Sequence, residues 1–216
     1  MDAVCFDMDG VIVDSERHWA PLENERILPR AVESGTVTAS DITGMNVADL
    51  HAHLAEEYGT TMSEAAFVAL YDEAAEELYT ERVALIEGFE PLCERLGERG
   101  AALSIVSSSP RRWIRFVLDR FDLRGAFDAV VSAEDVDGPS KPAPDVYERA
   151  AARLDAAPER CVAVEDSAHG VAAATAAGMY CVGYRTDANE SQDLSAADAI
   201  AAGPAALRER VEALCA

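Results

Sequence analysis

From Gly88 onward, short apolar runs alternate regularly with amphipathic helical patterns. The pattern predicts strands over 102–107, 128–132, 161–165 and 180–184, with helices near 89–98, 110–121, 144–154 and 169–177. Residues 198–200 are expected to add a short edge strand before a last helix near 204–214. Because strand–helix alternation is typical of parallel crossover units, we expect an α/β fold with a doubly wound parallel sheet.

A long segment with only helical patterns interrupts this alternation after the first apolar run. It contains a helix over 15–31 that Pro29 disturbs, a helix over 47–58 opened by Asn46, and a third helix that follows a possible capping box at Thr61–Glu64. We therefore expect a core of residues 1–14 and 87–216 and an inserted, all-helical domain of residues 15–86. The hinges between them should lie near Val13–Asp14 and Glu87–Gly88.

Two carboxylates, Asp7 and Asp9, come directly after the apolar run Ala3–Phe6 and precede Gly10. Open α/β sheets bind ligands at the carboxyl ends of their strands, and glycine allows the chain to turn sharply there. A solvated turn after an edge strand is the alternative, because Asp and Gly are ordinary turn residues. Three further segments favour a functional site, and the arrangement points to phosphoryl chemistry.

Each of these segments carries polar residues beside a predicted strand or helix. Ser107–Ser109 follow a strand and offer hydroxyl and backbone N–H donors that suit phosphate oxygens. Lys141 lies in a proline-rich turn and is the only lysine beside seventeen arginines, which argues against a surface-filling role. Glu165 and Asp166 form a second acidic pair at the end of another strand.

The order of these motifs resembles that of the haloacid-dehalogenase-like (HAD) hydrolase superfamily. The matching residues are Asp7-x-Asp9-Gly10, Ser107, Lys141-Pro142-x-Pro144 and Glu165-Asp166-Ser167. The stretch from Phe6 to Glu16 looks especially like members with a helical cap after the first strand, such as phosphoglycolate phosphatases and β-phosphoglucomutase. The resemblance covers the whole chain and implies a Rossmann-like HAD core with an inserted all-helical cap domain.

The resemblance also implies roles for individual residues. Asp7 would be a nucleophile that forms an aspartyl-phosphate, and Asp9 would protonate the leaving alcohol and later activate water. Mg²⁺ would be held by Asp7, the Asp9 carbonyl and Asp166, with Glu165 acting less directly. Lys141 would neutralise charge, and Ser107 and the Ser108 N–H would bind phosphate oxygens. Arg111, with Arg112, is a further candidate for contact with an anionic substrate.

Three functions are compatible with this set of residues. The first is a Mg²⁺-dependent phosphatase acting on a small phosphorylated metabolite, such as a sugar phosphate or phosphoglycolate. The second is an isomerase of the β-phosphoglucomutase type, which the absence of that family's histidine, replaced here by Trp19, and of basic residues over 43–47 disfavours. The third is a response-regulator-like phospho-acceptor, which the motif order argues against. Dehalogenation is disfavoured because a halide leaving group needs no proton from Asp9.

Composition limits the partners and the setting. Forty acidic residues against eighteen basic ones give a net charge of −22, which resembles proteins of salt-loaded cytoplasms. No basic stripe is present for nucleic acid, and no apolar run is long enough for a membrane helix. The five cysteines are odd in number and lack Cys-x-x-Cys spacing, as expected in a reducing cytoplasm. We expect a cytoplasmic monomer or small homo-oligomer.

Overall fold

The computed structural model describes residues 1–32, 37–42, 47–60 and 62–216. The chain divides into two compact units, one made of Met1–Asp14 with Ala84–Ala216 and the other of Ser15–Val83. The second unit is therefore an insertion between two segments of the first. In the described part of the chain, no helix is both long enough and apolar enough to cross a bilayer.

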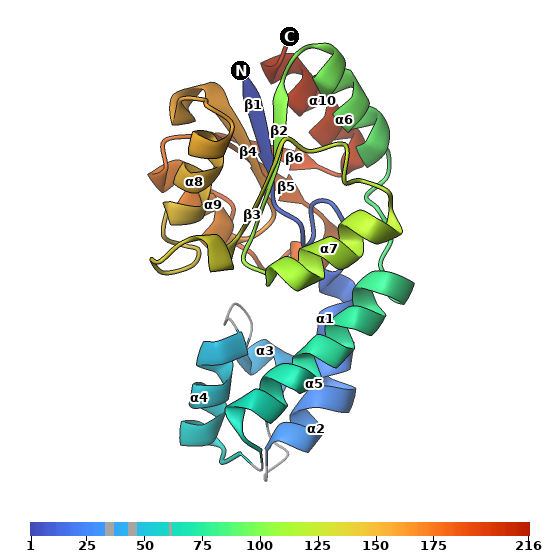
Figure 1. The fold of residues 1–216 in the computed structure, drawn as a ribbon, viewed down its shortest axis with the longest axis vertical. Coiled ribbons are helices and arrows are strands. Elements are labelled where there is room, and N and C mark those ends of the chain that lie inside the picture. Colours follow the sequence, from blue (N-terminus) through green and yellow to red (C-terminus); the bar gives the residue numbers. More distant parts are fainter. Residues whose placement is uncertain (33–36, 43–46, 61) are drawn as a thin grey trace. The chain divides into compact units, whose positions relative to one another are not determined.

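Six parallel strands form a single sheet in the first unit, in the order β3-β2-β1-β4-β5-β6 (Figure 1). They are β1 (Ala3–Phe6), β2 (Ala102–Ser107), β3 (Ala129–Ser132), β4 (Cys161–Glu165), β5 (Tyr180–Arg185) and β6 (Ala199–Ala202). β1 lies in the interior of the sheet, with Phe6 opposite Ile105 of β2 on one side and opposite Val164 of β4 on the other. The strand order changes direction between β1 and β4, which makes this pair the topological switch point.

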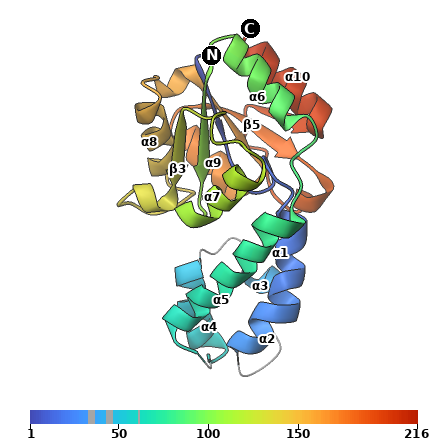
Figure 2. The same cartoon turned by 45° about the vertical axis from the view of Figure 1, so that its right-hand side comes forward.

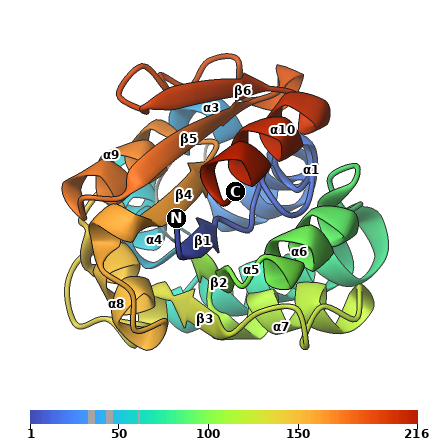
Figure 3. The ribbon, with the colours of Figure 1, turned by 90° about the horizontal axis from the view of Figure 1, so that it is seen from above.

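Helices cover both faces of the sheet, and the predicted doubly wound α/β fold is confirmed. In Figure 3, α8 (Asp145–Arg153) and α9 (Ala168–Ala176) lie on one face, and α6 (Phe89–Glu98), α7 (Arg111–Arg120) and α10 (Pro204–Leu214) lie on the other. Short 3₁₀ turns at Ala133–Asp135, Pro158–Arg160 and Asp187–Asn189 complete the connections. All four residues of β1 are buried, and Phe6 packs edge to face on Phe89 of α6 with 5.2 Å between ring centroids.

The regular elements in the described part of the second unit are all helices (Figure 2), and an isolated antiparallel bridge joins Val32 to Thr60. The unit contains α1 (Glu16–Leu22), a π-helical turn (Glu23–Ile27), α2 (Leu28–Ala31), α3 (Ala39–Ile42), α4 (Val47–Glu57), α5 (Glu64–Glu77) and a second π-helical turn (Leu78–Arg82). The backbone hydrogen bonding thus changes from α-helical to π-helical in the turn before Pro29. Proline has no N–H, and its ring clashes with the preceding turn of an α-helix. The short helix α3 was not expected.

The N-terminus of α5 differs from the predicted capping box. Ser63 is the N-cap, and its hydroxyl accepts a hydrogen bond from the Ala66 N–H at 3.4 Å. Thr61, the expected cap, lies outside the described residues, as do Asn46 and the stretch 43–46. The third predicted helix is otherwise confirmed, with Phe67, Leu70, Tyr71 and Ala74 buried on one face.

Candidate active site

The register of the sheet brings the two predicted acidic motifs together. Phe6 and Val164 are paired in β1 and β4, so the next residues, Asp7 and Glu165, follow at the same edge. The Asp7 N–H continues this pairing by donating to the Val164 carbonyl at 3.0 Å. Carboxylate oxygens of Asp7, Glu165 and Asp166 lie within 4.8 Å of one another, and all three residues are buried.

Gly10 is required where the chain leaves β1. Its φ is +75°, a conformation that side chains with a Cβ rarely adopt. A Cβ built on Gly10 would also overlap the carboxylate of Asp166. Gly10 therefore lets the chain turn after Asp7 and Asp9 and leaves room for the Asp166 carboxylate.

Lys141 links the two motifs through its ammonium group. Its Nζ donates to Asp7 Oδ1 at 2.6 Å, to Glu165 Oε1 at 2.6 Å and to the Val106 carbonyl at 2.9 Å. The three acceptors match the three donors of an ammonium group. The only lysine of the chain thus occupies the center of the predicted site, with 6 % of its side chain exposed.

Tyr147 is a neighbour that the sequence pattern did not identify. This buried residue of α8 donates its hydroxyl to Glu165 Oε1 at 2.6 Å. Its ring centroid lies 5.2 Å from Lys141 Nζ, within range of a cation–π interaction. A tyrosine shortly after the lysine turn was the available signal, but its helical position is equally typical of core packing.

Burial and the lysine–carboxylate pairing shift the pKa values of this cluster in opposite directions. The pKa of Asp7 is raised to about 8: burial is the largest cause, Lys141 opposes it, and the carboxylates of Glu165 and Asp9 add to it. Burial alone would lower the pKa of Lys141, but Asp7 and Glu165 outweigh burial and the pKa is raised. Burial also raises the pKa of Tyr147, with Glu165 adding to the shift, so its hydroxyl is a hydrogen-bond donor.

The donor set fits a divalent cation. Three carboxylates against one ammonium leave two negative charges in excess (−3 + 1) when all four groups are ionised. Such an excess is costly in a buried site, and the raised pKa of Asp7 reflects that cost. Carboxylate and carbonyl oxygens are the ligands that Mg²⁺ prefers. A dication among these residues would remove the imbalance.

The serine motif lies beside Asp9. The Ser109 hydroxyl donates to Asp9 Oδ2 at 2.8 Å, a contact that the serine motif did not predict. Ser107 is buried, and its Oγ accepts from the Ser109 N–H at 3.0 Å. Ser108 is exposed and its hydroxyl accepts from Ser140 at 3.1 Å, so the lysine turn and the serine motif are joined.

Arg111 is held by a different set of partners. Its guanidinium pairs with Asp135, which also pairs with Arg153 at 2.7 Å. The Arg111 N–H donates to Glu134 Oε2 at 3.1 Å. These contacts fasten the first turn of α7 to the turn after β3, and substrate contact by Arg111 stays a prediction.

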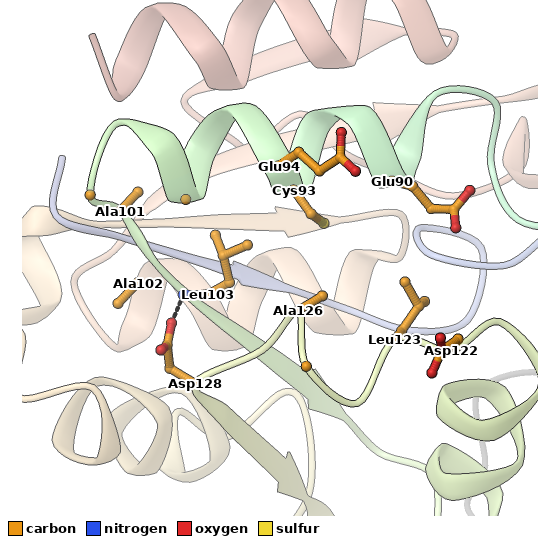
Figure 4. Close-up of a pocket in the computed structure, with 13 residues that line it drawn as sticks. Glu90, Cys93, Glu94, Ala101, Ala102, Leu103, Asp122, Leu123, Ala126 and Asp128 are labelled. Atoms are coloured by element: carbon orange, nitrogen blue, oxygen red, sulfur yellow. Dashed lines mark hydrogen bonds between the residues drawn. The ribbon is translucent and has the colours of Figure 1, made fainter.

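A pocket of about 620 Å³ lies elsewhere on the core (Figure 4). It is lined by residues of α6, the start of β2 and the segment before β3, where the Leu103 N–H donates to Asp128 at 2.9 Å. Ala102 begins β2 whereas Ser107 ends it, so this pocket lies at the amino end of the strand. The carboxylate cluster lies at the opposite, carboxyl ends of the strands, where open α/β sheets bind their ligands.

Comparison with known proteins identifies the family. Residues 1–178 match the family model described as haloacid dehalogenase-like hydrolase. The chain is 35% identical over 180 residues to hexitol phosphatase B of Escherichia coli, covering 82% of this chain and 80% of that protein. It is 31% identical over 206 residues to the phosphorylated carbohydrates phosphatase of Thermotoga maritima, covering 93% of each. The protein therefore belongs to the haloacid dehalogenase-like hydrolase family, as its motifs predicted.

A solved structure has a similar fold over most of the chain. The crystal structure of CbbY from Rhodobacter sphaeroides in complex with phosphate has a TM-score of 0.81, covering 93% of each chain. At 24% sequence identity, this likeness concerns the fold alone.

Proposed function

We propose that the protein is a Mg²⁺-dependent phosphatase that hydrolyses a small phosphorylated metabolite through an aspartyl-phosphate intermediate. The observation that carries the proposal is the buried Asp7 carboxylate, which lies against Lys141 and the Glu165–Asp166 pair at the switch point of the sheet. Relatives named as a hexitol phosphatase and a phosphorylated carbohydrates phosphatase favour a sugar phosphate as the substrate class.

In the proposed reaction, an oxygen of Asp7 attacks phosphorus as the bond from phosphorus to the ester oxygen breaks. Asp9 gives its proton to the departing alkoxide, which leaves as an alcohol. Asp9 then takes a proton from water as that water attacks phosphorus, which releases inorganic phosphate and restores Asp7. Asp9 lies near enough to Asp7 to raise its pKa, and Asp9 Oδ2 accepts a hydrogen bond from the Ser109 hydroxyl at 2.8 Å.

The remaining residues would bind and neutralise the phosphate. Asp7, the Asp9 carbonyl and Asp166 would hold Mg²⁺, which when bound supplies positive charge against the phosphate oxygens. Lys141 would neutralise charge beside Asp7, and Ser107 and the Ser108 N–H would bind non-transferring oxygens. The inserted unit Ser15–Val83 would act as the cap that selects the substrate.

Trp19 argues against the isomerase alternative. It occupies the position where the β-phosphoglucomutase family places a histidine, and it packs against Tyr71 and Tyr79 with ring centroids 5.9 Å and 6.1 Å away. Its indole N–H donates to the Tyr79 hydroxyl at 3.4 Å. An indole offers no base for moving a proton between sugar hydroxyls.

The test is phosphate release from an aryl phosphate and from a panel of phosphorylated metabolites, with and without Mg²⁺. Asp7→Asn and Asp9→Asn should each lower kcat by at least about a hundredfold. Asp187→Asn, which changes an exposed aspartate in the same way, should leave kcat unchanged. Undiminished turnover by Asp7→Asn would contradict the covalent mechanism.

Exchanging Ser15–Val83 for the matching segment of hexitol phosphatase B should change the ranking of substrates, and an unchanged ranking would place specificity in the core.

A further inference from the structure

We propose that Tyr147 is a positioning residue. Its hydroxyl holds the Glu165 carboxylate in contact with Lys141 and so keeps this carboxylate from binding the metal directly. The inference rests on the proposed phosphatase function for its catalytic consequence, and on the side-chain contacts for its geometry. It gives a structural reason for the less direct role of Glu165, with Asp7 and Asp166 as the carboxylates that bind the cation directly.

The first step of the argument is the occupancy of the Glu165 carboxylate. Oε1 accepts from Lys141 Nζ and from the Tyr147 hydroxyl, each at 2.6 Å. Oε2 accepts from the Ser167 hydroxyl at 3.3 Å. A carboxylate has about four acceptor positions, so most of this capacity is already in use. The Glu165 side chain is fully buried, so bulk solvent does not reach it.

The second step is the restriction of its movement. A Cβ built on Gly170, in the first turn of α9, would overlap the Glu165 carboxylate. The carboxylate therefore lies directly against the backbone of that turn. Because Lys141 and Tyr147 both donate to Glu165 Oε1, moving that oxygen toward a metal would break charge-assisted hydrogen bonds in a buried site.

The third step is the double contact that Tyr147 makes. Its hydroxyl donates to Glu165, and its ring centroid lies 5.2 Å from Lys141 Nζ, which also donates to Glu165. Tyr147 and Lys141 are close in sequence, on either side of the start of α8, and the Tyr147 N–H bonds to the Pro144 carbonyl at 2.9 Å. One side chain thus fixes both members of the Lys141–Glu165 pair, and through Lys141 the position of Asp7.

The test compares Tyr147→Phe, which keeps the ring and removes the hydroxyl, with the wild-type protein. Because Lys141 is the only lysine, protein grown with lysine labelled by ¹⁵N at Nζ gives one ammonium signal in an NMR spectrum. We expect this signal to shift and broaden in Tyr147→Phe, and kcat to fall about tenfold with KM nearly unchanged. The Mg²⁺ dissociation constant from calorimetry should change less than about twofold, because the ligands themselves are retained.

A matched control and a double variant complete the test. Tyr180→Phe removes a hydroxyl from β5 of the same unit and should leave the signal and kcat unchanged. If Tyr147 acts through Glu165, the double variant Tyr147→Phe/Glu165→Gln should lose no more activity than Glu165→Gln alone. Additive losses, an unmoved lysine signal or a large loss of Mg²⁺ affinity would overturn the proposal. A wild-type protein without phosphatase activity would defeat the proposed function, whereas the NMR and calorimetry would still decide the role of Tyr147.

Discussion

At the scale of single residues, two glycines shape the site by having no side chain. Gly10 makes room for Asp166, and Gly170 makes room for Glu165. Each acidic residue of the second motif is therefore matched by a glycine on another loop or helix. The carboxylates can lie this close to the backbone only because both positions are open.

Gly170→Ala should be destabilising, because its methyl group must displace the buried Glu165 carboxylate. We expect a loss of about 1–3 kcal/mol in the free energy of unfolding, as for other overpacked positions, together with lower kcat. Gly97→Ala in α6 is the matched control, since a Cβ there meets nothing within 4 Å. It should raise stability by about 0.5–1 kcal/mol, because alanine favours the helix. Urea unfolding measures both, and equal effects would contradict this account.

At the scale of elements, Asp135 joins three segments of the core. It pairs with Arg111 at the start of α7 and with Arg153 at the end of α8, and it accepts from the Ser132 N–H at 2.9 Å. Burial would raise the pKa of Asp135, but the two arginines and the Ser132 N–H outweigh burial and lower it below 3.8. A carboxylate with a lowered pKa stabilises the fold while it is ionised.

Asp135→Asn should therefore lower the free energy of unfolding by about 1–2 kcal/mol at pH 7. The stabilisation is complete above the unfolded-state pKa near 3.8 and is lost as the pH falls through the lower, folded-state value. The difference between wild type and variant should thus shrink below pH 3.8, as measured by denaturant unfolding across pH. Asp119→Asn, which breaks an exposed pair with Arg124, is the control and should change stability little at any pH. A difference that persists in acid would contradict the ion-pair explanation.

At the scale of the whole molecule, the net charge of −22 is the dominant feature. We propose that this acidity suits a concentrated salt solution, in which the Debye length falls from about 10 Å at 0.1 M to about 3 Å at 1 M. Raising KCl over that range should raise Tm, because repulsion among exposed acidic groups weakens. Replacing exposed Glu56 and Glu57 of α4 by glutamine should reduce the dependence of Tm on KCl. A Tm that does not respond to salt would disprove the adaptation.

The sequence predicted the core of the site better than its surroundings. Asp7, Glu165 and Asp166 could be placed together because strand ends in a parallel sheet meet at one edge, and Lys141 stood out as the only lysine of the chain. The partners of the Tyr147 and Ser109 hydroxyls could not be predicted, because the sequence does not show which groups tertiary packing brings next to a helix or loop side chain. The π-helical turn at Glu23–Ile27 was also missed, since its apolar spacing resembles that of an α-helix.

The five buried, unpaired cysteines have a practical consequence. Burial raises the pKa of all five thiols, to about 12 for Cys93 and about 11 for Cys161. Maleimides react with exposed thiolates, so the natural cysteines should stay unmodified in the folded protein. Glu57→Cys on the insertion and Glu209→Cys on α10 would then be selective attachment points for a pair of fluorescent dyes. Energy transfer between the dyes would follow the separation of the two units while the enzyme turns over.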